Sequence, residues 1–304
     1  MKLLHKGKVK EVYQFGEDKL LFNFTDQISV FDKVIPTLVP KKGEALARTS
    51  AFWFEACQKQ LGLDTHFVGL QDNDKMLVKR LQIIDPAKQA IGPNQVSFFI
   101  PLEVVCRHYA AGSLLDRLAS GEVKPERVGM TRAPKKGEKL PKPFIEFTTK
   151  LEETDRPLPD AEALKLSGLN EREFEALKKT VLDVDALISS KCEPKGLIHV
   201  DGKKEFGMNH RRELMLVDTF GTPDEDRWWD KAAYEKDGSQ IDLSKEMVRQ
   251  HYRSTGYHDQ LMAARKAGAT KQTEPPIPAL PPHVTADVTK LYVSLYERIT
   301  GAKW

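Results

Sequence analysis

The chain has 304 residues, of which 30% are charged and 40% hydrophobic, and its formal net charge is +3. This composition is typical of a globular protein with one large domain or two, and so small a charge gives no argument for nucleic-acid binding. The three cysteines, Cys57, Cys106 and Cys192, lie far apart without metal-binding spacing, which fits a reducing compartment. We find neither a signal peptide nor the run of about 18 apolar residues that a membrane span needs, so we expect a cytoplasmic protein without membrane contact.

The N-terminal segment predicts a β-hairpin, with one strand over residues 3–15 and a turn at residues 16–18. Gly7 would let a ligand approach the backbone closely. Lys8 and Lys10 are expected on one face of the strand, where they could cover nucleotide phosphates as the glycine-rich loop of a kinase does. The alternative is an exposed sheet edge whose lysines prevent aggregation.

The next segments predict a cleft-lining loop over residues 25–32, a core helix over 44–61 and two short strands. Lys79 stands at the end of the second strand, where it would either pair with a phosphate or extend into solvent. Residues 85–97 contain proline and glycine and predict an extended connection, so a domain boundary is expected there.

A strongly apolar strand follows over residues 98–107 and ends in Arg107. Ser113 stands at the start of a short predicted helix and could cap it. The start of this helix, together with the arginine, would suit an anion. Residues 121–143 predict a surface loop. Binding of RNA there is a weak alternative, because aromatic residues do not alternate with the lysines.

The most informative stretch is a predicted hairpin over residues 197–218, preceded by an amphipathic helix. Asp201, Lys203 and Glu205 alternate along its first strand and should share one face. A turn centred on residues 210 and 211 would place Lys203 opposite Asp218. Carboxylates and an ammonium on adjacent strands suit Mg²⁺ and phosphates, although an amphipathic hairpin with a salt-bridged outer face would show the same pattern.

Taken in order, five segments resemble the SAICAR synthetase (phosphoribosylaminoimidazole-succinocarboxamide synthase) family. These are the nucleotide loop Gly7–Tyr13, the segment Asp26–Asp32, the signature Pro101–Ser113, the strand Asp201–Gly207 and the turn Thr222–Arg227. Each motif alone is moderately specific, but the resemblance extends over nearly the whole chain.

The resemblance implies an α+β fold in which a small antiparallel lobe, residues 1–92, covers a larger mixed domain, residues 93–304, with an ATP cleft between them. It implies ATP-dependent ligation of L-aspartate to 5-aminoimidazole-4-carboxylate ribonucleotide (CAIR) in purine biosynthesis, through an acyl phosphate. ATP and Mg²⁺ are the implied cofactors. The expected partners are these small molecules alone, with no nucleic acid or membrane, and the sequence leaves the oligomeric state open.

The resemblance also assigns site residues. ATP would be bound by Gly7, Lys8, Val9, Lys10, Lys79, Glu205 and Asp218, the last two also holding Mg²⁺. The nucleotide substrate would be bound by Ser29, Asp32, Arg107, Ser113, Asp224 and Arg227. Lys150, Asp201 and Lys203 would be the catalytic residues.

The chain departs from the family pattern beside the proposed metal ligand, where Thr219 stands in place of the usual glutamate. A different ATP-dependent ligase or a small-molecule kinase on the same scaffold therefore remains an alternative. A non-catalytic nucleotide-binding protein is disfavoured, because Lys203, Glu205 and Asp218 are all present.

Overall fold

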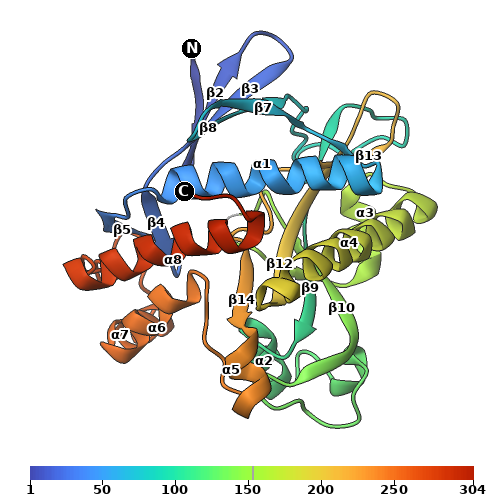
Figure 1. The fold of residues 1–304 in the computed structure, drawn as a ribbon. Coiled ribbons are helices and arrows are strands. Elements are labelled where there is room, and N and C mark those ends of the chain that lie inside the picture. Colours follow the sequence, from blue (N-terminus) through green and yellow to red (C-terminus); the bar gives the residue numbers. More distant parts are fainter. Residues whose placement is uncertain (153) are drawn as a thin grey trace.

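The structure is a computed structural model that describes residues 1–152 and 154–304 (Figure 1). Its first sheet is antiparallel, with the strand order β1-β2-β3-β8-β7. These strands are β1 (Leu3–Lys6), β2 (Lys10–Phe15), β3 (Lys19–Phe24), β7 (Phe67–Asp72) and β8 (Lys75–Lys79). A separate hairpin of β4 (Gln27–Val30) and β5 (Lys33–Leu38) follows β3 in the chain.

The second sheet is larger, and its two longest strands, β9 and β12, lie side by side at its centre. Its order is β11-β10-β9-β12-β13-β6, and β14 also pairs with β12. Only the β13–β6 pair is parallel among the described strands of this sheet. The strands are β6 (Asp64–Thr65), β9 (Phe98–Tyr109), β10 (Lys139–Thr149), β11 (Pro157–Leu158), β12 (Leu197–Met208), β13 (Leu214–Val217) and β14 (Asp226–Asp230).

Helices pack around the larger sheet, and the first and last α-helices lie side by side beneath the small sheet (Figure 1). The helices are α1 (Lys42–Leu61), α2 (Ser113–Ala119), α3 (Asp160–Ser167), α4 (Glu171–Cys192), α5 (Lys231–Asp237), α6 (Glu246–Ser254), α7 (Tyr257–Lys266) and α8 (Pro282–Thr300). Two 3₁₀ turns occur at Pro125–Val128 and Glu193–Lys195.

Local sequence explains where the two long core helices begin and end. Helix α4 starts at Asn170, whose side chain accepts from the N–H of Glu173 while the Glu173 carboxylate accepts from the Asn170 N–H. Helix α1 ends at Gly62, whose φ of 64° is the left-handed conformation that glycine adopts without a steric penalty.

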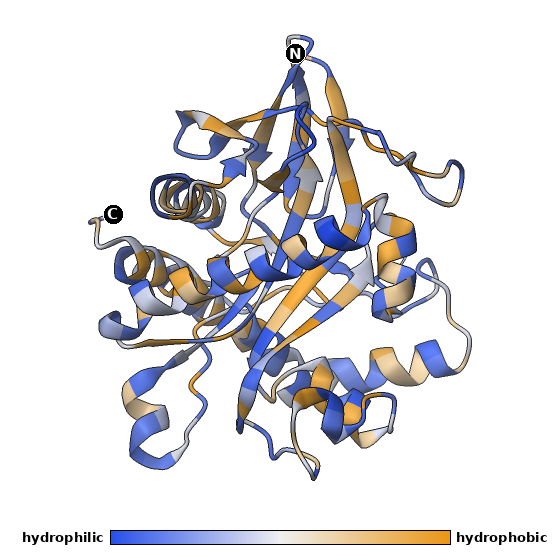
Figure 2. Ribbon diagram, turned by 90° about the vertical axis from the view of Figure 1, so that its right-hand side faces the viewer, coloured by the Kyte–Doolittle hydropathy of each residue, from blue (hydrophilic) through white to orange (hydrophobic). Residues whose placement is uncertain are grey.

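One hydrophobic core joins the two sheets. It includes Phe22 and Val78 from the small sheet, Trp53 from α1, Phe206 from β12 and Tyr292 from α8. Figure 2 shows hydrophobic colour along the central strands, and helices in which hydrophobic and hydrophilic residues alternate. No helix among the described residues is both long and apolar enough to cross a membrane.

The predicted strand over residues 3–15 is wrong in one respect. The chain reverses at residues 7–9, so that β1 and β2 pair antiparallel, with Leu3 opposite Tyr13. The Gly7 N–H donates to the carbonyl of Lys10, which closes this turn. Lys8 therefore lies in the turn and only Lys10 lies in a strand, so the predicted alternation of the two lysines along one strand is wrong. The predicted hairpin turn at residues 16–18 is present.

The predicted register of the central hairpin is wrong by one residue. Glu205 pairs with Val217, so the turn is centred on Arg211 and the position opposite Lys203 would be Thr219. Asp218 lies just beyond β13 with a φ of 55°, outside the regular strand alternation. Its side chain still reaches the same site, because this left-handed residue breaks the pleat.

Candidate active site

A cavity of about 1730 Å³ lies between the small sheet and the larger sheet. Most of the predicted site residues line it. They are Gly7, Lys8, Val9, Lys10, Ser29, Asp32, Lys79, Lys150, Lys203, Glu205, Asp218 and Asp224. The four other predicted residues, Arg107, Ser113, Asp201 and Arg227, form a neighbouring cluster described below.

Two lysines and two glutamates form the centre of the cavity. The Lys150 Nζ lies 2.8 Å from both Glu103 Oε1 and Glu205 Oε1. Lys203 Nζ lies 2.8 Å from the same Glu103 oxygen and 3.1 Å from Glu225 Oε2. Both lysines are therefore fixed by carboxylates on β9 and β12, with their ammonium groups directed into the cavity.

Electrostatics at this centre favour charged lysines. Burial opposes ionisation of Lys150, but Glu205 and Glu103 outweigh it and raise its pKa above the ordinary value. Burial likewise opposes ionisation of Asp218, yet Lys10 and Lys150 hold its pKa well below the ordinary range. Burial raises the pKa of Glu205 to about 7 despite its lysine partners. The lysines thus carry positive charge where an anionic reactant would lie.

The lysines of the small sheet reach the cavity from above. Lys10 is paired with Asp218 of the larger sheet, which joins the two sides of the cavity. Lys8 Nζ lies 2.5 Å from Asp32, and Lys79 Nζ lies 2.8 Å from Asp64. Lys8 and Lys79 are about half exposed, so an anionic ligand can compete for both.

The second cluster is built around Asp201, which pairs with both Arg107 and Arg227. Arg107 also pairs with Glu146 and donates to the Ser113 hydroxyl over 3.3 Å. Ser113 is the first residue of α2 and makes no capping hydrogen bond, so its predicted capping role is wrong. The two arginines and the serine still lie together, although their positions in the sequence alone do not require this contact.

Glu103 and Glu225 are functional candidates that the sequence reading missed. Glu103 is buried and accepts hydrogen bonds from both Lys150 and Lys203, and Glu225 forms an ion pair with Lys203. A signal for Glu103 was available, because it is an acid inside the apolar strand 98–106, where an unpaired charge would be costly. Lys245 and Arg249 also line the cavity without having been predicted.

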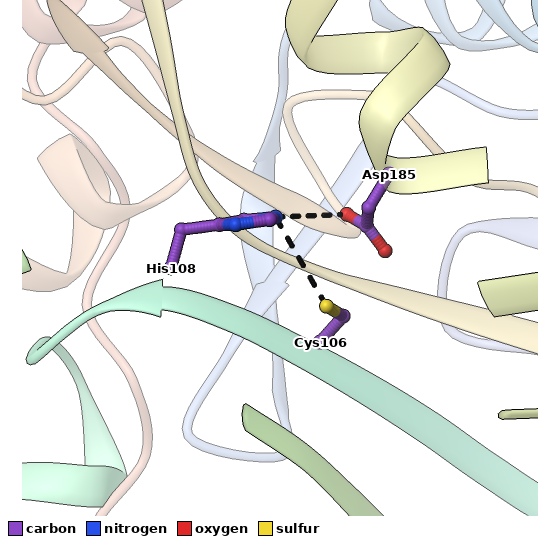
Figure 3. Close-up of side chains that lie close together, drawn as sticks. All are labelled: Cys106, His108 and Asp185. Atoms are coloured by element: carbon purple, nitrogen blue, oxygen red, sulfur yellow. Dashed lines mark hydrogen bonds and ion pairs between the residues drawn. The ribbon is translucent and has the colours of Figure 1, made fainter. Parts of the chain in front are cut away.

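Cys106, His108 and Asp185 lie close together away from the cavity and have the donor atoms of a metal site (Figure 3). Lys204 Nζ lies 2.9 Å from the Asp185 oxygen, so an ammonium already provides the positive charge. Burial raises the pKa of the Cys106 thiol well above its ordinary value, which opposes the thiolate that a metal needs. We interpret this group as a buried polar network that joins α4 to β9 and β12.

The family model described as SAICAR synthetase matches residues 3–264. The chain is 49% identical over 304 residues to the phosphoribosylaminoimidazole-succinocarboxamide synthase of Thermoplasma acidophilum and 47% identical to that of Thermoplasma volcanium, covering 100% of each chain.

Solved structures of SAICAR synthetases also match this chain over nearly its whole length. A SAICAR synthetase in complex with ADP is 25% identical, with a TM-score of 0.69, covering 99% of this chain and 98% of that one. The SAICAR synthase of Saccharomyces cerevisiae in complex with SAICAR has a TM-score of 0.76 at 24% identity, covering 99% of this chain and 95% of that one. At 24% identity, this yeast structure supports the fold assignment only.

These matches confirm the predicted α+β fold and the predicted enzyme class, an ATP-dependent carbon–nitrogen ligase that joins L-aspartate to CAIR in purine biosynthesis. They do not favour the alternative ligase or kinase. The chain belongs to the SAICAR synthetase family.

Proposed function

We propose that the cavity binds ATP, CAIR and L-aspartate together and that Lys150 and Lys203 stabilise the charge of the reacting groups. The observation that carries this proposal is the position of both ammonium groups, which share Glu103 and Glu205 at the centre of the cavity. Fixed cations in a site that excludes water stabilise developing negative charge without reorganisation.

The small sheet is the proposed nucleotide side. Gly7, Lys8, Val9 and Lys10 form the turn and strand start that line the cavity there, with Lys79 at the end of β8. Val12, Leu20, Leu81 and Phe99 add apolar surface of the kind an adenine ring needs. A structural neighbour was solved in complex with ADP, which supports adenine-nucleotide binding by this fold.

Glu205 and Asp218 are the proposed Mg²⁺ ligands. Glu205 is buried and Asp218 is partly buried at the cavity wall, and both supply the hard oxygen donors that Mg²⁺ prefers. Here each is paired with a lysine, which holds its oxygen atoms in place. Once bound, the ion would neutralise phosphate charge beside the lysines.

The ribonucleotide is the proposed ligand of the neighbouring cluster. Arg107, Ser113 and Arg227 present the guanidinium and hydroxyl donors that suit its phosphate. Ser29, Asp32 and Asp224 line the adjoining cavity wall. Asp201 lies between the two arginines, so we propose that it holds their orientation beside the reacting centre.

In the proposed reaction, an oxygen of the CAIR carboxylate attacks the γ-phosphorus of ATP, and ADP leaves. The amine of L-aspartate then attacks the carbonyl carbon of the acyl phosphate, inorganic phosphate leaves and the amine loses a proton. Lys150 and Lys203 stabilise the anionic transition states of both steps. Positioning of three substrates is the main contribution of the protein, since the reaction needs no protein nucleophile.

Release of ADP tests the proposal. We expect release only when ATP, CAIR and L-aspartate are all present, with L-alanine very poor and L-asparagine clearly worse than L-aspartate. L-Glutamate completes the comparison as a longer diacid. A preference for another amine, or ADP release that ignores the amine, would contradict the proposed substrate.

A further inference from the structure

The Asp224 carboxylate lies between two buried lysines at the edge of the cavity. Its Oδ2 lies 2.9 Å from Lys42 Nζ and 3.6 Å from Lys245 Nζ. Tyr292 of α8 donates a hydrogen bond to the other oxygen, Oδ1. Three separate parts of the chain therefore converge on one acidic group.

This group carries more positive than negative charge. Lys42 is fully buried and Lys245 is nearly so, and Asp224 is the carboxylate that both contact. Arg249 lines the cavity beside them, and its partner Glu246 is also shared with Arg227 and Arg253. Uncompensated cations are costly in a protein interior, so an anion at this position would be strongly favoured.

Hydrogen bonding at the centre of the group is incomplete among the described residues. Lys42 Nζ and Asp224 Oδ2 form an ion pair, but neither atom has a hydrogen-bond partner in acceptable geometry. Burial also lowers the pKa of Lys245, against the opposing effect of Asp224. Lys42 Nζ therefore has N–H groups without an acceptor in good geometry, and it adds positive charge just behind the cavity wall formed by Asp224 and Lys245.

The group adjoins the reaction centre. Asp224, Glu225, Lys245 and Arg249 all line the cavity, and Glu225 pairs with the catalytic Lys203. The central lysines already have carboxylate partners: Lys150 has Glu103 and Glu205, and Lys203 has these two and Glu225. Those two lysines therefore face three carboxylates. Lys245 and Arg249 also have carboxylate partners, but Asp224 is shared with Lys42 and Glu246 with Arg227 and Arg253, so positive charge is in excess on that side of the cavity.

We propose that Lys245 and Arg249, supported by buried Lys42, bind one of the two carboxylates of the L-aspartate substrate. The inference rests on the proposed function, which leaves the aspartate position unassigned. A phosphate is the other anion with suitable chemistry. We assign the ribonucleotide phosphate to Arg107, Ser113 and Arg227, because that cluster contains two arginines and a hydroxyl.

Steady-state kinetics of Lys245→Met and Arg249→Gln test the assignment. We expect the KM for L-aspartate to rise by about tenfold or more, with the KM values for ATP and CAIR changed by less than about threefold. Arg253→Gln is the matched control, since Arg253 shares Glu246 with Arg249 but does not line the cavity. A rise in the KM for CAIR instead would assign the anion site to the ribonucleotide and overturn the inference.

Amide analogues separate binding from a structural effect. L-Asparagine lacks the side-chain carboxylate and L-isoasparagine lacks the α-carboxylate. If Lys245 pairs with one of these groups, the wild-type preference for L-aspartate over the corresponding amide should shrink by about tenfold in Lys245→Met, as a double-mutant cycle requires. If Lys245→Met discriminates against both amides as strongly as the wild type does, the inference is overturned. Lys245→Arg keeps the positive charge and should keep the wild-type discrimination. Absence of turnover by the wild-type enzyme with ATP, CAIR and L-aspartate would instead contradict the proposed function itself.

Discussion

At the scale of single residues, the cavity is organised by carboxylates that fix lysines. Glu103 illustrates the limit of sequence reasoning. An acid was visible in an apolar strand, but its partners are Lys150, just after β10, and Lys203 of β12. The pairing depends on strand neighbours that no local pattern reveals. Lys203, Glu205 and Lys150 were predicted from motifs, and their mutual contacts emerge only in the folded sheet.

The proposed Mg²⁺ ligands give the first prediction. Glu205→Gln and Asp218→Asn should each lower kcat/KM for Mg-ATP by about 100-fold or more, because each removes an anionic oxygen donor beside the phosphates. The measurement is ADP release as a function of Mg²⁺ concentration. Glu213→Gln is the control, as Glu213 is exposed and lies near the turn of the same hairpin. Near-wild-type turnover at low Mg²⁺ in both variants would remove the metal assignment.

Elements were predicted well where hydrophobic periodicity is strong and less well where a turn decides the path. The helices over residues 44–61 and 170–192 closely match α1 and α4. The reversal at Gly7 and the register of the central hairpin were not predicted correctly, because glycine permits many turns and Arg212 in the hairpin turn adopts a left-handed conformation with a φ of 58°. Turn geometry is therefore the main source of error in the predicted secondary structure.

The approach of α2 to Arg227 gives a second prediction. Gly112 has a φ of 57°, and a Cβ at this position would lie 2.7 Å from Arg227 Nη2. Gly112→Ala should displace Arg227 and raise the KM for CAIR by roughly tenfold while leaving the KM for ATP nearly unchanged. Gly121→Ala is the control, because Gly121 has a φ of 78° and open space around its Cβ position. Equal effects of both variants would attribute the change to backbone strain.

The contact between α4 and β12 gives a prediction about pH. Burial opposes ionisation of Asp185, but Lys204 and the neighbouring histidines lower its pKa from 3.8 to about 2. Because the folded-state pKa is the lower one, Asp185 stabilises the fold above about pH 4, and this contribution of about 2 kcal/mol is lost as the pH falls toward 2.

Asp185→Asn should therefore reduce the free energy of unfolding at pH 7 by about 3 kcal/mol, since Lys204 loses its closest carboxylate, and should weaken the pH dependence between 4 and 2. Urea unfolding at a series of pH values measures both effects. Asp183→Asn on the exposed side of the same helix is the control. An unchanged slope between pH 4 and 2 would contradict the assigned role of Asp185.

At the scale of the whole molecule, the division into residues 1–92 and 93–304 stays a prediction. The small sheet lies entirely before residue 92, which agrees with a distinct nucleotide lobe. Other parts of the same segment belong physically to the larger body. β6 pairs with β13, and the indole N–H of buried Trp53 donates to the Gly221 carbonyl over 3.0 Å.

This mixed packing predicts how the chain unfolds. We expect a fragment of residues 1–92 not to fold alone, because α1 would expose its core face and Trp53 would lose the carbonyl that its indole N–H contacts. Calorimetry of the full chain should show one transition, since a single core includes residues of both sheets. Hydrogen exchange of β8 and β12 amides should report similar free energies of opening. A cooperative urea transition of the isolated fragment would show that the nucleotide lobe is an independent folding unit.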